Sequence, residues 1–202
     1  MIAVLAGGVG AARLLGGLVQ VVPPPEITAG VNGGDDLELH GLHVSPDLDT
    51  ITYTLAGEIN PETGWGLRDE SWQAMESLER YGGEAWFRLG DRDLGTHLYR
   101  TQRLSEGATL SQATAEIARG WGLEVVLRPV TDDRLRTIVT VAGAGEIGFQ
   151  EYFVHRRHSV EVSSVRFDGA ITRSWRCPEC GTPSWPAVSR RWRCRPSWPA
   201  WR

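Results

Sequence analysis

The stretch Met1-Ile-Ala-Val-Leu-Ala-Gly7-Gly8-Val9-Gly10-Ala-Ala-Arg13-Leu14 decides the fold of this chain. A short apolar run leads into closely spaced glycines, and a helix-forming segment follows. This order predicts a buried strand, a tight turn and a helix. Glycines let the backbone approach an anion closely, and the N–H groups at the start of the helix can hold it. The segment therefore predicts a site for a nucleotide or a diphosphate.

Two common phosphate-binding patterns fit this turn poorly. The dinucleotide pattern G-x-G-x-x-G needs a third glycine where Arg13 stands. A Walker-type loop needs a lysine, and all 21 basic residues of the chain are arginine. An NAD-type oxidoreductase stays as an alternative. It would need an acidic residue at the end of the second strand to bind the ribose, and Glu26, which has a suitable distance from the glycine turn, precedes that strand instead. A plain strand-to-helix turn is the other alternative.

The charge of the chain divides it into two parts. The net charge of −4 combines −10 over residues 1–171 with +6 over residues 172–202. An acidic body does not suit a nucleic-acid backbone, so no nucleic-acid partner is expected. A chain of 202 residues has the size of a single domain, and we expect residues 1–170 to form one α/β domain.

The segment 172–202 has no helical or strand period and is rich in Trp, Arg, Pro and Cys. Cys177 and Cys180 have the spacing of half a zinc site with Cys194 as a third ligand, but no fourth Cys or His follows. Such a mixture is typical of G+C-rich DNA translated out of frame. We therefore expect a disordered tail, and a native reading frame that ends near Ala170.

Nothing in the sequence indicates export or a membrane. The amino-terminal apolar run stops at Gly7, and no window approaches the roughly 20 apolar residues of a membrane span. The acidic body contains no cysteine and needs no oxidising compartment. We expect a cytoplasmic protein with no membrane partner; the residues do not fix the oligomeric state, and a homodimer stays open.

A βαβ unit is expected at the amino terminus. Pro23–Pro25 ends the first helical segment, and Ile27–Val31 predicts a second strand, followed by the loop Asn32–Asp36. Ligands bind at the carboxyl ends of parallel strands, so this loop and the glycine turn should face one crevice. Further helices are predicted at 69–81, 91–104 and 110–121, the last capped by Thr109 or Ser111, and strands at 125–130, 137–141, 149–155 and 160–167.

Two loops deliver four aspartates, namely Asp35, Asp36, Asp47 and Asp49, and no basic residue stands between Arg13 and Arg68 to neutralise them. Carboxylates that gather without a counter-charge favour a divalent cation, and Mg²⁺ takes carboxylate and phosphate oxygens. The sequence therefore predicts a metal–diphosphate site. The alternative for Asp47 is a helix cap, because it stands near a predicted helix start.

Three further sets of side chains are candidates for chemistry. Arg88 and Arg92 offer bidentate donors that could clamp a diphosphate, although Arg92 could instead pair within its helix. Trp65, between two glycines, could stack on a planar ligand or pack in the core. His40, His43 and His97 lack metal-site spacing, and we expect them at the surface or hydrogen-bonded in the core.

Together these segments resemble the 2-phospho-L-lactate transferases (CofD, called FbiA in the bacterial branch) of coenzyme F-420 biosynthesis. The resembling segments run in family order over residues 1–168, and they are Ala6–Arg13, Val31–Asp36, Ser45–Thr50 with Tyr53–Leu55, Gly64–Gly66, Arg68–Glu70, Leu89–Leu94 with Thr96–Leu98, Thr131–Arg134 and Phe149–Glu151.

The resemblance implies a Rossmann-like α/β fold, a three-layer sandwich around a mostly parallel sheet, and a Mg²⁺-dependent transferase. The family moves a phospholactyl or phosphoenolpyruvyl group from a guanosine diphosphate-linked donor to the primary hydroxyl of the deazaflavin Fo, and releases GMP. Which three-carbon acid the donor carries is left open.

The resemblance also implies residue roles. Asp49 would contact the Fo hydroxyl and orient or deprotonate it, and Arg88 matches a position that contacts Fo in some members. Mg²⁺ would be held by Asp36, Asp47 and Asp49. The implied substrate-binding residues are Gly7, Gly8, Gly10, Arg13, Asn32, Trp65 and Arg92.

The resemblance stops near Ala170, whereas family members extend to roughly 300 residues. The expected missing part completes the sheet and meets the guanosine, so the sheet should expose an apolar edge. An inactive nucleotide-binding remnant of the enzyme is therefore the alternative function.

Overall fold

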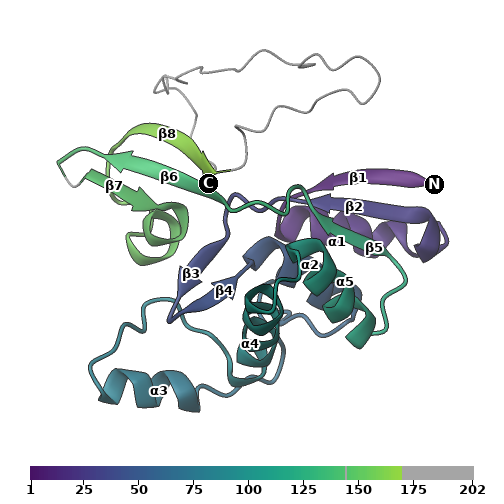
Figure 1. Ribbon diagram of the computed structural model, residues 1–202, viewed down its shortest axis with the longest axis horizontal. Coiled ribbons are helices and arrows are strands. Elements are labelled where there is room, and N and C mark those ends of the chain that lie inside the picture. Colours follow the sequence, from purple (N-terminus) through teal and green to yellow (C-terminus); the bar gives the residue numbers. More distant parts are fainter. Residues whose placement is uncertain (144, 170–202) are drawn as a thin grey trace. The chain divides into compact units, whose positions relative to one another are not determined.

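The computed structural model describes residues 1–143 and 145–169 (Figure 1). The chain divides into two compact units, Met1–Arg134 and the part from Leu135 onward, and each is described by itself. The tail expected at 172–202 lies outside the described residues, so its predicted disorder is not tested.

A parallel sheet forms the centre of the first unit. It contains β1 (Ile2–Ala6), β2 (Ile27–Val31) and β5 (Val126–Pro129) in the order β1-β2-β5, with both pairings parallel. Helix α1 (Val9–Leu18) and the short 3₁₀ turn η1 (Pro24–Glu26) connect β1 to β2. The predicted βαβ unit is therefore confirmed, and Pro24 begins the turn because its fixed φ suits a first helical position.

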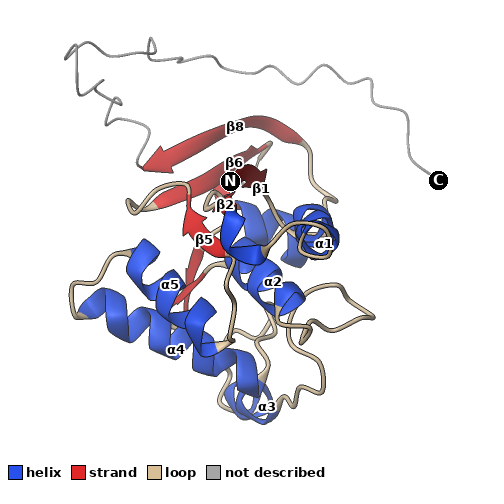
Figure 2. Ribbon diagram, turned by 90° about the vertical axis from the view of Figure 1, so that its right-hand side faces the viewer, coloured by secondary structure: helices blue, strands red, loops and turns tan. Residues whose placement is uncertain are grey.

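Helices cover one face of this sheet. Buried side chains of β2 and β5 pack against α1, α2 (Pro46–Leu55) and α5 (Leu110–Gly120), and these helices lie on the same side of the strands in Figure 2. The shared core contains Leu15, Ile27, Ala29, Val31, Leu48, Ile51, Leu110 and Leu127. The mixed α/β class is thus confirmed, but within the described ranges this unit has two layers, and the third layer stays a prediction.

Both outer strands of the sheet are unpaired on one side within the described ranges, because β1 and β5 each pair with β2 alone. Leu5, near the end of β1, is 92% exposed, so an apolar side chain lies uncovered on a face of the sheet. The unpaired edges agree with the edge that the sequence led us to expect.

A second group of elements lies beyond the sheet. It contains the hairpin β3 (Leu37–Leu39) and β4 (Leu42–Val44), helix α3 (Gln73–Arg80) and helix α4 (Asp91–Ser105). Leu39, Val44, Met75 and Leu89 form its core. None of the helices in the described ranges has both the length and the apolar content that crossing a membrane requires.

The hairpin was not predicted. His40 and Gly41 form its two-residue turn with φ values of 54° and 74°. Such a turn favours Asn-Gly or Asp-Gly, so the pair His-Gly gave a weak signal.

The second unit is an antiparallel sheet of β6 (Leu135–Val141), β7 (Gly145–Gly148) and β8 (Val162–Gly169) in the order β7-β6-β8. The strand predicted at 149–155 is wrong, because Glu151–His155 forms a π-helical turn (η2). The rings of Phe149 and Phe153 stack 5.5 Å apart, a spacing of four residues that a helical turn brings together.

Helix α5 begins with a complete capping box. Thr109 Oγ1 accepts a hydrogen bond from the Gln112 backbone N–H at 3.2 Å, and Gln112 Oε1 accepts one from the Thr109 N–H at 2.8 Å. Of the two predicted caps, Thr109 is therefore the one used. Ser111 instead contributes its backbone N–H to Asp132.

We expect Thr109→Ala to lower the free energy of unfolding by about 1 kcal/mol, because the backbone N–H of Gln112 loses its hydrogen bond to the Thr109 hydroxyl. Urea unfolding followed by circular dichroism measures this change. Ser111→Ala is the control and should change stability by less than about 0.5 kcal/mol. Equal losses in both variants would show that the box does not stabilise the helix.

Candidate functional site

The glycine turn lies against the carboxylate of Asp47. A Cβ atom placed on Gly8 would meet Asp47 Oδ1 at 2.6 Å, so only glycine allows this approach. Asn32 Nδ2 donates a hydrogen bond to Asp47 Oδ2 at 2.9 Å. The glycine turn, the loop after β2 and the start of α2 therefore meet at one point, as the expected crevice required.

Asp36 completes this acidic cluster. Its Oδ2 atom accepts a hydrogen bond from Ser45 Oγ at 2.9 Å and lies 3.2 Å from His43 Nε2. Its Oδ1 atom is buried and has no hydrogen-bond partner in the described part of the chain. Ser45 is the N-cap residue of α2, yet its hydroxyl bonds to Asp36 instead of the helix. The alternative of Asp47 as a cap is wrong, because Asp47 lies inside the first turn.

Burial and repulsion between carboxylates raise the pKa values of Asp35 and Asp47. Burial, followed by the charge of Asp47, raises the pKa of Asp35 to about 6, against a hydrogen bond from Asn32 that lowers it. Burial also raises the pKa of Asp47, and the charge of Asp36 adds to the shift. A cation among these oxygens would relieve the repulsion.

The donor set fits a magnesium ion. Carboxylate oxygens are ligands that Mg²⁺ prefers, and the unpartnered Oδ1 of Asp36 is an atom that such an ion would satisfy.

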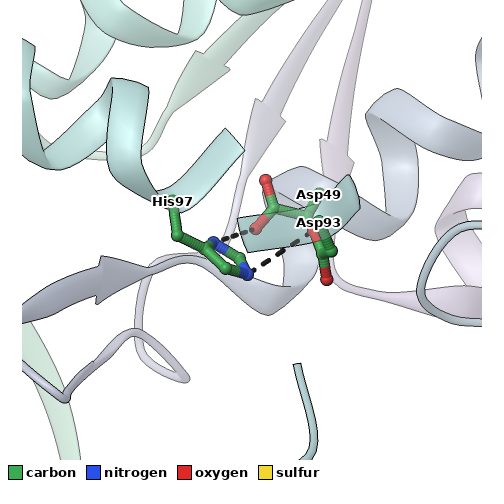
Figure 3. A group of neighbouring side chains, drawn as sticks. All are labelled: Asp49, Asp93 and His97. Carbon is green, nitrogen blue, oxygen red and sulfur yellow. Dashed lines mark ion pairs between the residues drawn. The ribbon is translucent and has the colours of Figure 1, made fainter. Parts of the chain in front are cut away.

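Asp49 lies in a different, buried site (Figure 3). The guanidinium of Arg100 on α4 contacts both of its carboxylate oxygens, with Nη1 3.2 Å from Oδ2 and Nη2 bonded to Oδ1. Burial raises the pKa of Asp49, and the charge of Arg100 opposes this shift. Arg100 thus supplies the counter-charge that the neighbouring sequence lacks.

His97 lies between Asp49 and Asp93 (Figure 3). Its side chain is 1% exposed, with Nδ1 3.6 Å from Asp49 Oδ2 and Nε2 3.4 Å from Asp93 Oδ1. The hydroxyl of Tyr53 donates to the same Asp93 oxygen. Burial alone would raise the pKa of Asp93, but the hydrogen bonds and charge of its partners lower it.

These three residues could hold a metal ion by proximity alone. However, each ring nitrogen of His97 faces a different carboxylate, and Arg100 already neutralises Asp49. His97 Nε2 has no hydrogen-bond partner in the described part of the chain, but the charge of Arg100 already balances Asp49, which disfavours a second cation here. His97 lies in the core, one of the two places expected for it. Asp93 and Arg100 were not among the predicted site residues, although their spacings of four and three residues from His97 mark one face of a helix.

A pocket of about 50 Å³ lies beside Asp93. Its lining includes the half-exposed Trp65 and the guanidinium of Arg88, which lies 5.0 Å from the ring centroid of Trp72. Two residues singled out in the sequence, Trp65 and Arg88, therefore share one pocket. Glu70 and Asp93 supply its carboxylates.

The start of α4 is fixed by Glu70. Its two carboxylate oxygens accept the backbone N–H groups of Arg92 at 2.9 Å and Asp93 at 2.8 Å. A Cβ atom on Gly90 would lie 2.2 Å from Glu70 Cδ, so this contact also requires glycine. Asp91 in return accepts hydrogen bonds from the N–H groups of Gln73 and Ala74 at the start of α3.

The remaining predicted arginines differ in their surroundings. Arg92 donates to the carbonyl of Arg68 at 2.9 Å and lies 3.6 Å from Glu58, so the protein itself holds it. Arg13 is exposed on α1, and its Nη2 would lie 4.0 Å from a Cβ placed on Gly64. The loop that carries Trp65 therefore packs on the first turn of α1, next to the glycine turn.

Residues 2–174 match the family described as 2-phospho-L-lactate transferase CofD. The chain belongs to the CofD family. It is 51% identical over 168 residues to a phosphoenolpyruvate transferase of Streptomyces griseus, covering 81% of this chain and 53% of that relative. The phosphoenolpyruvate transferase of Mycobacterium tuberculosis is 45% identical over 188 residues, with 84% and 57% covered. The chain thus spans about half the length of these curated relatives.

A solved structure supports the fold. A crystal structure of a Bacillus halodurans protein aligns with a TM-score of 0.51 at 16% identity, covering 90% of this chain and 52% of that one. At this identity the likeness shows the fold alone.

In this CofD-family chain the predicted residues fall into two places. One is the acidic cluster at the glycine turn, formed by Gly7, Gly8, Asn32, Asp36 and Asp47. The other is the pocket with Trp65 and Arg88. Asp49 belongs to neither, and Gly10 lies in the first turn of α1 with open space around its Cα.

We expect Asp35→Asn to raise the urea midpoint at pH 7.5 and to change it little at pH 4. Folding raises the pKa of Asp35 from 3.8 to about 6, so between these values the native state keeps a proton that the unfolded chain has lost. The free energy of unfolding therefore falls as the pH rises through this window, and the loss remains at higher pH.

Asp133→Asn, at an exposed turn, is the control for this experiment. Saturating Mg²⁺ should reduce the difference between wild type and Asp35→Asn at pH 7.5. A variant that is no more stable than wild type at pH 7.5 would contradict the repulsion described above.

Gly90→Ala should lower the free energy of unfolding by about 1–3 kcal/mol, because its methyl group would overlap Glu70 and displace the cap of α4. Thermal unfolding measures the loss. Gly95→Ala is the matched control within the same helix, since its Cα faces open space and alanine is the better helix former by about 1 kcal/mol. Destabilisation by both substitutions would point to a general intolerance of α4.

Proposed function

We propose that this chain binds a guanosine diphosphate-linked donor and the deazaflavin Fo. In the whole protein it would serve the transfer of a three-carbon phosphoacid group in coenzyme F-420 biosynthesis. The names of the relatives favour phosphoenolpyruvyl over phospholactyl as the group transferred. The observation that carries the proposal is the meeting of Gly8, Asn32 and Asp47 at the start of α1.

The donor would lie at the acidic cluster. Asp36 and Asp47 are the residues that would hold Mg²⁺, and the ion would neutralise charge on the diphosphate. The first-turn N–H groups of α1 can bind phosphate oxygens, and the exposed Arg13 extends from the same helix. We leave Asp49 out of the ligand set, because Arg100 already balances its charge and its side chain is 7% exposed.

The acceptor would lie at the pocket with Trp65 and Arg88. A volume of about 50 Å³ admits the hydroxylated end of a side chain but not a tricyclic ring. The ring would therefore stack on the exposed face of Trp65, while Arg88 is held over Trp72 at the pocket wall.

The proposed reaction depends on positioning of the donor and the acceptor more than on covalent catalysis by the protein. The acceptor oxygen forms a bond to phosphorus as the bond to GMP breaks, so cancellation of charge and positioning supply most of the rate. The Trp65 loop packs on the first turn of α1, so the two proposed sites would lie beside each other. Cytoplasmic location and a homodimer stay predictions.

A nucleotide-binding remnant without turnover is the second candidate, because the chain spans about half the length of its curated relatives. Binding and turnover therefore need separate measurements. An NAD-type oxidoreductase is the third outcome that the experiment has to separate.

Isothermal titration with GDP, with and without Mg²⁺, tests the proposed function. We expect binding that needs Mg²⁺ and that weakens at least about tenfold in Gly8→Ala, a loss of about 1.4 kcal/mol. The substitution would push Asp47 away from the turn. Gly17→Ala in the same helix has open space around it and should bind like wild type.

Addition of Fo and a phosphoenolpyruvyl-linked donor then separates the candidates. Formation of the dehydro-phospholactyl deazaflavin indicates the transferase, and GDP binding without product indicates the remnant. Binding of NADH in place of GDP would refute both.

A further inference from the structure

We propose that His43 and Ser45 are positioning residues for Asp36. They hold one of its carboxylate oxygens, Oδ2, so that the other, Oδ1, is offered to a divalent cation as a single ligand atom. The two residues would thereby favour Mg²⁺ over Ca²⁺. The inference rests on the proposed function, because it concerns the ion that Asp36 and Asp47 would hold there.

The two carboxylate oxygens of Asp36 have different surroundings. Oδ2 accepts a hydrogen bond from Ser45 Oγ at 2.9 Å and lies 3.2 Å from His43 Nε2. Oδ1 is buried without a hydrogen-bond partner among the described residues, and the whole side chain is only 8% exposed. A buried carboxylate oxygen costs free energy unless a hydrogen bond or a cation compensates it. Oδ1 is therefore the atom of Asp36 that suits an ion.

Both partners of Oδ2 act as donors. An ionised carboxylate has only acceptor atoms, so the hydrogen between Asp36 and His43 belongs to Nε2 of the imidazole. Ser45 is fully buried at the start of α2, and its hydroxyl donates to Asp36 instead of capping the helix. Two donors on one oxygen restrict rotation of the carboxylate, and this restriction also fixes the position of Oδ1.

The backbone of His43 is itself fixed. Its N–H donates to Thr101 Oγ1 at 2.8 Å, and its carbonyl accepts from Arg100 Nη1 at 3.3 Å, with both partners on α4. His43 also pairs with Glu38 across the hairpin of β3 and β4. The imidazole therefore approaches Asp36 from an anchored strand, which is the arrangement expected of a group that orients a metal ligand.

The negative charge of the cluster stays available to a cation. The charge of Asp36 adds to burial in raising the pKa of Asp47, so the two carboxylates lie close enough to repel each other. The donors that hold them are a hydroxyl, an imidazole and the amide of Asn32, and none of these needs a positive charge. Asp49, in contrast, is balanced by Arg100.

A carboxylate whose second oxygen is hydrogen-bonded favours one cation over the other. Ca²⁺ takes about 6–8 oxygen ligands and often binds both oxygens of one carboxylate, whereas Mg²⁺ needs a tight octahedral site. Because Ser45 and His43 hold Oδ2 of Asp36, they disfavour the two-oxygen contact that Ca²⁺ uses. Loss of either donor would free Oδ2 and admit the larger ion.

Competition between metal ions on the full chain tests the inference. Mn²⁺, which takes similar oxygen ligands, is the probe, and electron paramagnetic resonance follows its free concentration. Mg²⁺ should displace Mn²⁺ at a concentration at least about tenfold lower than Ca²⁺ does, a difference of about 1.4 kcal/mol. Asp47→Asn should weaken Mn²⁺ binding at least about tenfold, which would locate the ion at the acidic cluster.

Substitutions of the two positioning residues then separate aiming from packing. Ser45→Ala and His43→Phe should each weaken Mg²⁺ binding about tenfold or more and reduce the preference for Mg²⁺ over Ca²⁺. His43→Gln, which keeps an N–H donor, should restore part of that preference at an equal unfolding temperature. A merely structural role would weaken the binding of both ions equally and would leave the preference unchanged.

His40→Asn is the matched control, because His40 is exposed in the turn of the same hairpin and asparagine tolerates its φ of 54°. This variant should bind both ions like wild type.

The outcomes distinguish this inference from the proposed function. If Ser45→Ala and His43→Phe keep the affinity and the preference of wild type, the inference is overturned while the proposed function stands. If wild type itself binds Mg²⁺ and Ca²⁺ equally well, the inference is overturned without any variant. If wild type binds no divalent ion, the proposed metal site and this inference both fail.

Discussion

The buried ion pair between Asp49 and Arg100 is the interaction on which the candidate site depends. It joins α2, which carries Asp47 of the acidic cluster, to α4, which carries Asp93 of the pocket. A carboxylate at this depth is stable only with a matched partner, and the loss of either charge leaves the other buried and unpaired. The pair therefore holds the acidic cluster and the pocket in one arrangement.

The geometry of α2 explains why the four aspartates do not form one group. Asp47 and Asp49 are two residues apart, and side chains with this spacing point to different sides of a helix. Asp47 faces the glycine turn, while Asp49 faces α4. Because they lie in the same helical turn, Asp47 contributes to the acidic cluster, whereas Asp49 forms the ion pair with Arg100.

Much of the first unit could be predicted because its signals are local. The strand, glycine turn and helix at residues 2–18, and the loop at Asn32, follow from parallel strands whose carboxyl ends share an edge. The partner of Asp49 could not be found in this way, since Arg100 lies 51 positions along the chain. The turn at His40 and the π-helical turn after Gln150 were not predicted either, because neither has a strong local sequence signal.

Glu70 limits how far the size of the pocket can change by substitution. The same carboxylate lines the pocket and accepts the first N–H groups of α4, and Gly90 leaves no room for it to move. A shorter side chain there would widen the cavity but would leave the first N–H groups of α4, the helix that carries Asp93, without their acceptor. Changes in ligand size are therefore accommodated more easily at lining residues that cap no helix, such as Thr63.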